Sequence, residues 1–356
     1  MDSIISIIIP CRNEERYIVA CLESVQAFSI PTGIQIEILV LDGCSEDQTL
    51  QLVTCLAARD TRIRIIKNPK RIQSTAVNIG LRNARGEWIM RLDAHAEYPP
   101  NYLMLCHETA IRSKADNVGG IFITHPGGRG YGALLVQALT THKFGVGDSG
   151  FRTGAKEDWA DTVPYGFYRR DVFTKLGWLD ERLVRAQDYE FNRRIIISGG
   201  RILRNPLIQI KYYNQPTIWR FLVKQIAKEA PYNAYLWYIA PYAFAPRHAI
   251  TGVFSAGLLA GLILSPLTPW IAWPFAFVMG VYWFLALASG LQQAIRFRSP
   301  MHALALPFCF FLYHSIHGLG VLLGLVKLAT RTAPVQQATE PWPGAGRRRA
   351  WPAPSA

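Results

Sequence analysis

An acid and an imidazole stand two positions apart where an apolar segment of the chain ends. Residues 87–92 have the composition of a buried strand, and Asp93 and His95 follow it. Alternate side chains of an extended chain point the same way, so these two face one direction. A carboxylate beside an imidazole suits Mn²⁺ or a similar divalent ion. The pair predicts a metal site, with a polar turn at the strand end as the alternative.

Strand-like and helix-like segments alternate along the part of the chain that must position this pair. The pattern predicts strands at residues 3–9, 35–41, 62–66, 87–92 and 117–123, and helices at residues 15–28, 46–59, 73–84, 101–113 and 187–198. This alternation predicts an α/β fold with a mostly parallel sheet covered on both faces. Such sheets bind ligands beyond the carboxyl ends of their strands. We therefore expect Asp93 and His95 at that edge.

A glycine-rich, charged segment at residues 127–161 interrupts the alternation. Long irregular segments in compact domains are often lids or binding loops. We expect a mobile loop here, with one short helix near residues 134–142.

The last third of the chain has a different composition. No Asp or Glu occurs between Glu229 and Glu340, and apolar stretches cover residues 249–264, 270–289 and 303–326. Each is near the roughly 20 residues that cross a bilayer. Basic residues flank these stretches, so the net charge of +13 indicates membrane lipids as a partner, not nucleic acid.

The expected location is the inner (plasma) membrane, multi-pass, with a cytoplasmic N-terminal domain. The sequence shows no signal peptide, and its six cysteines form no Cys-x-x-Cys pair. Three full crossings would place Lys327 and Arg331 outside the cell, against the positive-inside tendency. Two crossings, or a last segment that enters and returns, therefore stay open.

Residues 217–229 suggest an amphipathic helix before the membrane region. Trp219, Leu222, Val223 and Ile226 fall on one helical face. A helix on the membrane surface and a helix packed on the soluble domain are both open. The expected domains are residues 1–215, interfacial helices at 216–248, a membrane region of two to three helices at 249–328, and a disordered basic tail at 329–356.

Two polar loops follow the first two expected strands. One begins at Pro10 and the other at Asp42, and neither contains the Gly-x-Gly-x-x-Gly of dinucleotide sites. Asp42 is suited to accept a hydrogen bond from a ligand N–H group. Its alternative role is to cap the helix that follows.

Five motifs in series resemble a family 2 glycosyltransferase. Such a protein has a GT-A domain, the Rossmann-like fold of nucleotide-diphospho-sugar transferases, here followed by C-terminal transmembrane helices. The C-terminal part and the Asp-Ala-His form resemble the succinoglycan-type enzymes of exopolysaccharide biosynthesis. The matching motifs are Pro10-x-x-Asn13-Glu14, Asp42-Gly43-x-Ser45-x-Asp47-x-Thr49, Ala76-x-Asn78-x-Gly80, Leu92-Asp93-Ala94-His95 and Gln187-Asp188-x-Glu190.

The resemblance implies roles in binding a nucleotide sugar. Asp42 would bind the uracil edge of a UDP-linked donor, and Arg71 and Asn78 would lie near its phosphates or ribose. The remaining residues, which would shape the nucleotide pocket, are Pro10, Asn13 and Glu14.

The resemblance also implies a metal and a base. Asp93 and His95 stand where the family has Asp-x-Asp, and Asp188 stands where it has the catalytic base. An imidazole brings one less negative charge than a second Asp, so Mn²⁺ should be favoured over Mg²⁺. A base facing the leaving group across the sugar means inversion at C1. Without the resemblance, Asp188 could equally cap its helix or pair with an arginine.

Residues 165–170 carry aromatic and basic side chains. Arg169 or Arg170 could hold the acceptor or a diphosphate. The alternative is a buried strand whose arginines face solvent.

The sequence therefore predicts an inverting, metal-dependent glycosyltransferase. It would move one sugar from a nucleotide sugar, with UDP favoured, to a polyprenyl-diphosphate-linked saccharide acceptor. One alternative is a processive polysaccharide synthase, although its Gln-x-x-Arg-Trp motif is missing. The other is a non-catalytic, membrane-anchored nucleotide-sugar binding protein, which only Gly43 and His95 favour.

Overall fold

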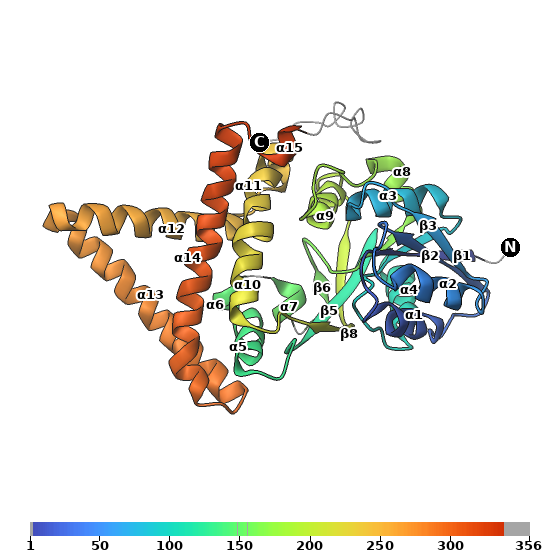
Figure 1. Cartoon of the computed structure of the whole chain (residues 1–356), viewed down its shortest axis with the longest axis horizontal. Helices are drawn as coiled ribbons and strands as arrows, with labels where there is room; N and C mark the ends of the chain where they lie inside the picture. The colour runs from blue at the N-terminus through green and yellow to red at the C-terminus, as the bar shows by residue number, and fades with distance from the viewer. Residues whose placement is uncertain (1–2, 148, 155, 338–356) are drawn as a thin grey trace. The chain divides into compact units, whose positions relative to one another are not determined.

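The computed structural model describes residues 3–147, 149–154 and 156–337, which form two compact units. Unit 1 contains residues 3–123 and 154–212, and unit 2 contains residues 124–153 and 213–337. The domain bounds expected from the sequence stay a prediction. Figure 1 labels the elements of both units.

Unit 1 is built on an eight-stranded sheet with the order β3-β2-β1-β4-β7-β5-β8-β6. The first four strands in this order are parallel, and β7 runs antiparallel to both β4 and β5. The strands are β1 (Ser3–Cys11), β2 (Ile34–Asp42), β3 (Ile63–Lys67), β4 (Trp88–Arg91), β5 (Asn117–His125), β6 (Asp158–Trp159), β7 (Phe167–Arg169) and β8 (Ile202–Tyr213).

Helices pack on both faces of this sheet, which explains why its central strands are apolar throughout. Ile5, Ile7 and Ile9 of β1 lie in one core cluster, whereas Ile8 lies in the other. The mixed α/β fold expected from the sequence is confirmed. The helices of unit 1 are α1 (Ile18–Gln26), α2 (Thr49–Ala57), α3 (Gln73–Asn83), α4 (Tyr102–Ser113), α8 (Arg170–Leu176) and α9 (Gln187–Ile197).

The short helix expected near residues 134–142 is confirmed as α5 (Tyr131–Thr140). Two further short helices, α6 (Lys143–Val146) and α7 (Gly150–Thr153), follow it in the segment expected to be a loop. The buried side chains of α5 share a core cluster with Phe221, Phe310 and Tyr313, so this segment belongs to unit 2. The apolar side chains of α5 therefore pack against residues that are distant in sequence, such as Phe310 and Tyr313.

Unit 2 is helical. Its C-terminal elements are α10 (Ile218–Lys224), η1 (Gln225–Glu229), α11 (Ala230–Ile239), η2 (Pro241–Ala243), α12 (Pro246–Leu264), η3 (Ser265–Leu267), α13 (Pro269–Arg296), α14 (Met301–Ala329) and α15 (Pro334–Gln337). Three of its helical segments are long and apolar enough to cross a membrane: 246–267, 269–296 and 301–337. They support membrane association.

The expected tail at residues 329–356 is described only in part. Residues 334–337 form α15, and Val335 is buried beside Tyr235. The rest of that expectation, residues 338–356, lies outside the described residues.

The single apolar face expected over residues 217–229 divides into two. Phe221 and Leu222 are buried, whereas Trp219 is 68% exposed and Val223 is 42% exposed. The helix is thus packed on protein along one side and still exposes apolar side chains along another. Its placement on a membrane surface stays a prediction.

A buried ion pair holds α9 in unit 1. Arg194 Nη2 lies 2.7 Å from Glu190 Oε2, and both side chains are almost fully buried. Arg194 also donates hydrogen bonds to the carbonyl oxygens of Leu176 and Trp178. The Glu190 of the fifth motif therefore stabilises the helix that carries Asp188.

We predict that Arg194→Met lowers the free energy of unfolding by about 3–5 kcal/mol, because it removes the guanidinium that pairs with the buried Glu190 carboxylate. Thermal unfolding of the purified full-length protein measures this loss. Lys175→Met, which breaks the exposed pair with Asp171, should cost less than about 1 kcal/mol. Equal losses in the two variants would contradict the structural role of the buried pair.

Candidate active site

Asp93 follows β4 at the carboxyl end of the parallel strands, where the sequence placed it. Its Oδ1 accepts a hydrogen bond from Arg91 Nη2 at 2.6 Å and another from Gln73 Nε2 at 3.1 Å. Its backbone N–H donates to the Tyr98 hydroxyl. Burial raises the pKa of Asp93, but the charges of Arg91 and His95 outweigh it, so this pKa lies below its usual value. The carboxylate is ionised at neutral pH.

His95 lies between two carboxylates. Its Nδ1 is 3.2 Å from Glu14 Oε1, and its Nε2 is 3.9 Å from Asp93 Oδ2. The hydrogen bond to Glu14, together with the nearby Asp93, raises the pKa of His95 despite the partial desolvation of its ring. Glu14 of the motif Pro10-x-x-Asn13-Glu14 therefore contacts His95 of the motif Leu92-Asp93-Ala94-His95.

The residues at this edge fit a divalent ion in part. A separation of 3.9 Å between Asp93 Oδ2 and His95 Nε2 leaves room for one ion bound to both atoms. The described residues contain no group of three or more His, Cys, Asp or Glu side chains arranged around one point. Mg²⁺-type sites often keep waters and use substrate phosphates as further ligands, which this pair would require.

Asp188 lies in the first turn of α9, and Arg91 connects it to the same edge. The negative charges of Asp93 and Asp188 both raise the pKa of Arg91, against the effect of burial. Hydrogen bonds also link the start of α9 to Asp93. Gln187 Nε2 donates to Gln73 Oε1 at 2.8 Å, and Gln73 Nε2 donates to Asp93 Oδ1. Asp93 and Asp188 therefore lie on one side of the sheet.

Side chains join the loops after β1 and β2. Asn13 Oδ1 accepts from the Glu46 N–H at 2.9 Å, and the Asn13 N–H donates to Ser45 Oγ. The Ser45 hydroxyl donates to Asp42 Oδ1 at 2.6 Å. Asp42 thus closes its own turn, and α2 begins later, at Thr49. These bonds hold the two polar loops as one surface.

Pro10, one residue before the end of β1, does not disturb the sheet. The last pair between β1 and β4 joins Ile8 to Arg91, and the Leu92 N–H donates to the Ile8 carbonyl oxygen. Pro10 lies beyond this point, so its missing N–H removes no bond to β4.

Several loops at this edge hold a residue with a positive φ angle. A non-glycine residue rarely adopts this conformation, and such residues cluster at functional sites. Each of the five precedes or follows an element that contributes to the site: Asn13 at 56°, Cys44 at 56°, Arg71 at 59°, Tyr165 at 47° and Ala186 at 61°.

Arg71 and Asn78 have different surroundings. Arg71 Nη1 lies 3.3 Å from Glu46 Oε1 at the exposed rim of the two loops. Asn78 is buried, and its amide bonds to both the N–H and the carbonyl oxygen of Leu179 and to Glu181. Asn78 therefore positions the segment before α9, and its contact with a ligand stays a prediction.

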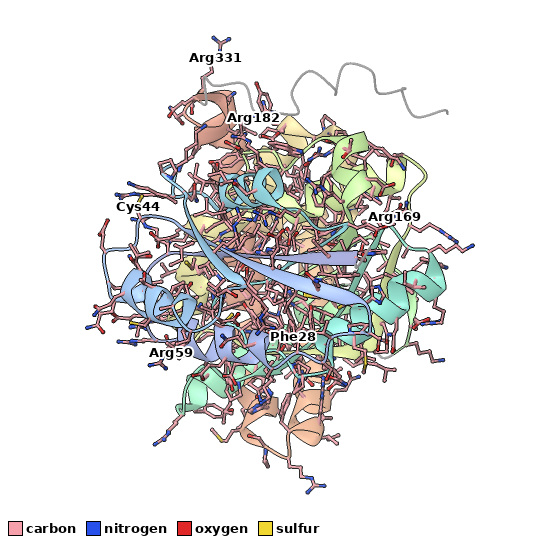
Figure 2. All side chains as sticks on the ribbon, turned by 90° about the vertical axis from the view of Figure 1, so that its right-hand side faces the viewer. Phe28, Cys44, Arg59, Arg169, Arg182 and Arg331 are labelled. Atoms are coloured by element: carbon pink, nitrogen blue, oxygen red, sulfur yellow. The ribbon has the colours of Figure 1, made fainter. Side chains whose placement is uncertain are left out.

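The structure places Arg169 and Arg170 near the amino end of β4, and their contact with the acceptor or a diphosphate stays a prediction. Because β7 is antiparallel to β4, Arg169 pairs with Trp88 at the amino end of β4. Arg170 Nη1 lies 3.4 Å from the Gly86 carbonyl oxygen. In Figure 2, Cys44 of the β2–α2 loop and Arg169 lie on opposite sides of the view. The alternative, a strand with its arginines at the surface, describes Arg169.

Arg91 and Gln73 were missed by the sequence reasoning, which expected Tyr165 only as part of the aromatic and basic segment 165–170. Arg91 binds Asp93, Gln73 links Asp93 to Gln187, and the Tyr165 ring lies 5.2 Å below the Arg91 guanidinium. An arginine inside an otherwise apolar strand was the available signal, because a buried arginine requires a partner. No local feature of the sequence indicates that Gln73 belongs to this site.

Comparisons with known proteins agree with this geometry. The model of "Glycosyl transferase family 2" matches residues 6–177. A dolichyl N-acetyl-α-D-glucosaminyl phosphate 3-β-D-2,3-diacetamido-2,3-dideoxy-β-D-glucuronosyltransferase from Methanococcus voltae is 29% identical, over 91% of this chain and 97% of its own. A succinoglycan biosynthesis protein from Rhizobium meliloti is also 29% identical, over 84% and 88% of the two chains.

A solved structure shows the fold. A mannosyltransferase from Pyrobaculum calidifontis, in complex with GDP-mannose and Mn²⁺, superposes with a TM-score of 0.55 and 20% identity. The match covers 91% of this chain and 86% of that one. The GT-A fold implied by the motifs is confirmed.

We predict that Arg91→Met lowers the free energy of unfolding by about 3 kcal/mol near neutral pH, because Asp93 then stays buried and unpaired. In the wild type the depressed Asp93 pKa adds stability above the ordinary carboxyl pKa, and this stability is lost as the pH falls through the folded value. The loss caused by the substitution should therefore shrink only below the ordinary carboxyl pKa, toward about pH 3. Thermal unfolding of the full-length protein at both pH values measures it.

Arg169→Met is the matched control, since its partner Asp171 is exposed to solvent in part. It should cost less than about 1 kcal/mol at either pH. If Arg91→Met behaves like Arg169→Met at both pH values, the Arg91–Asp93 pair does not stabilise this edge.

Proposed function

We propose that the chain is a family 2 glycosyl transferase that moves one sugar from a UDP-linked donor to a polyprenyl-diphosphate-linked saccharide, with inversion at C1. The observation that carries the proposal is the position of two acids. Asp93 and Asp188 lie on the same side of the sheet, joined through Arg91 and through Gln73. That arrangement suits a sugar held between its leaving diphosphate and an attacking hydroxyl.

The donor would lie across the loops after β1 and β2. Pro10, Asn13 and Glu14 would shape its pocket, and Asp42 would accept a hydrogen bond from the uracil. The bonds between Asn13, Ser45 and Asp42 support this role, because they fix the loops before a ligand binds.

The departing diphosphate needs positive charge nearby. Asp93 and His95 would hold a divalent ion, Mn²⁺ in preference to Mg²⁺, and the bound ion would stabilise the charge that develops on the leaving oxygen. Arg91 keeps Asp93 ionised and in place, as their 2.6 Å pair indicates. The similar mannosyltransferase structure contains Mn²⁺, which supports a metal-dependent reaction.

Asp188 would act as the base. Its carboxylate would accept the proton of the acceptor hydroxyl while that oxygen attacks C1. It lies in the first turn of α9, where a negative charge interacts favourably with the helix dipole. The hydrogen bond between Gln187 and Gln73 would fix this turn relative to Asp93.

A lipid-linked acceptor agrees with both the relatives and the helices. The name of the Methanococcus relative specifies a dolichyl-linked phosphate acceptor, and the Rhizobium relative serves succinoglycan biosynthesis. The three apolar helices would keep the enzyme at the membrane that carries such an acceptor. We place it in the inner (plasma) membrane with unit 1 in the cytoplasm.

We predict that Asp188→Asn lowers the transfer rate at least about 10³-fold and leaves nucleotide affinity nearly unchanged, since it removes the base without touching the donor. Membranes that contain the protein would be incubated with a panel of radiolabelled UDP-sugars, and label extracted into organic solvent would be counted. Asp171→Asn, at the opposite edge of the sheet, should transfer normally. Normal turnover by Asp188→Asn would refute the base assignment, and the wild type should label lipid with one donor.

A second prediction concerns the metal. Chelation with EDTA should abolish transfer, and Mn²⁺ should restore it at a lower concentration than Mg²⁺. His95→Asp adds a carboxylate, which Mg²⁺ prefers to imidazole, so the variant should narrow the difference between the two ions. Titration of each ion against transfer measures this. Full activity after chelation would contradict a metal-dependent reaction.

A further inference from the structure

Two of the three long apolar helices form a hairpin whose tip lies away from α14. The early part of α12 packs on α14 where Gly318 meets Thr251, and the later part of α13 packs on it where Gly290 meets Pro307. Beyond these contacts the two helices converge on each other, as Figure 1 shows. At their shared tip Trp270 is 88% exposed. The hairpin thus projects from α14.

The hairpin carries no charge between its two ends. Residues 249–295 contain no Asp, Glu, Lys or Arg, whereas Arg247 begins α12 and Arg296 ends α13. Its 19-residue α12 is about 28 Å long, close to the roughly 30 Å of a hydrocarbon core. Both helices therefore have the composition and length expected inside a bilayer.

The two ends of the hairpin meet the same segment of unit 2. Arg296 Nη1 donates to the Thr141 carbonyl oxygen at 2.9 Å, and His142 Nε2 lies 2.9 Å from Gln292 Oε1. At the start of α12, Arg247 lies beside Gly147. The residues around α6 thus hold both basic ends together, so the hairpin starts and ends on one side.

The third helix, α14, has charged neighbours along its middle. The Phe221 and Tyr313 rings are 5.4 Å apart, and Gly320 packs against Ile226 and Ala230. The helical segment of residues 218–239 therefore runs beside α14, as Figure 1 also shows. The charged side chains at this level are Arg220, Lys224, Lys228 and Glu229.

These charges are incompatible with a simple crossing by α14. Lys224 and Glu229 pair at 3.4 Å, but Arg220 and Lys228 are exposed. If the middle of α14 lay at the bilayer centre, these side chains would lie there too. Charged side chains at that depth are strongly unfavourable unless they face protein or water.

We propose that only the α12–α13 hairpin enters the hydrocarbon core, and that α14 lies along the bilayer surface with α10, η1 and α11. The exposed side chains of α10 fit this position. Trp219 and Val223 form an apolar stripe, and Arg220, Lys224 and Lys228 lie one residue further round the helix. Such a helix places apolar side chains at the acyl boundary and bases at anionic headgroups.

The exposed side of α14 fits the same surface. Its apolar stripe comprises Leu304, Phe308, Leu312, Leu319 and Leu323. With α14 in the plane, Arg296, Arg298, Lys327 and Arg331 all lie on one side of the membrane. This satisfies the positive-inside tendency that three crossings would break.

Cysteine labelling with a membrane-impermeant maleimide tests the proposal in intact cells and inverted vesicles. The exposed native Cys55 reports the side of unit 1. Thr268→Cys, Ser299→Cys and Thr330→Cys would each be made in a background with Cys44 and Cys55 replaced by Ser. Ser299→Cys and Thr330→Cys should label from the Cys55 side, and Thr268→Cys should not.

Labelling of Ser299→Cys and Thr330→Cys from opposite sides would overturn the proposal, because α14 would then cross. Labelling of Thr268→Cys from the Cys55 side would overturn it as well, because the hairpin would then lie outside the core. Neither outcome depends on enzymatic activity, so the topology and the proposed reaction can fail separately.

A depth measurement gives a second, independent test. In nanodiscs of phosphatidylglycerol and phosphatidylcholine, a fluorophore on cysteines at Leu304, Leu312 and Leu323 would be quenched by spin-labelled lipids of two depths. An in-plane α14 predicts the same shallow depth for all three positions, and a deeper value for Val278→Cys on α13. A deeper value for Leu312→Cys than for both neighbours would contradict the proposal.

Discussion

The site depends on one ion pair at the end of one strand. Arg91 and Asp93 approach to 2.6 Å in a largely buried position, where neither charge is stable alone. Gln73 bonds to the same carboxylate oxygen, and the charge of Asp188 reaches the same guanidinium. The end of β4, the start of α3 and the start of α9 therefore all interact with the Arg91–Asp93 pair. A change at Arg91 would disturb all three elements.

A second constraint governs unit 2, where the distribution of charge decides what can enter a bilayer. The segment at residues 249–295 has no charged side chain and few protein neighbours, whereas α14 is equally apolar but packs beside a charged helix. By length and hydropathy all three helices could cross a membrane, and only its packing beside a charged helix distinguishes α14 from α12 and α13. The same physical rule therefore operates in both units: a charge is tolerated where a partner or water meets it.

Much of the fold could be predicted from the sequence because its signals are local. Strand β1 was expected at residues 3–9 and is Ser3–Cys11, and helix α3 was expected at residues 73–84 and is Gln73–Asn83. The motifs also placed Asp93 and Asp188 correctly at strand and helix ends. What the sequence did not indicate depends on contacts distant in sequence. The antiparallel direction of β7 places Arg169 at the amino end of β4, and the expected loop contains α6 and α7, where Phe144 of α6 packs against a cluster that includes Phe310 and Tyr313.

The central claim is that a donor lies between Asp93 and Asp188. A cryo-EM structure of the full chain in nanodiscs, with Mn²⁺ and a non-hydrolysable UDP-sugar, tests it most directly. The account predicts the diphosphate beside Asp93 and the sugar between it and the Asp188 carboxylate. A nucleotide bound elsewhere in unit 1, or a sugar that Asp188 does not face, would contradict it.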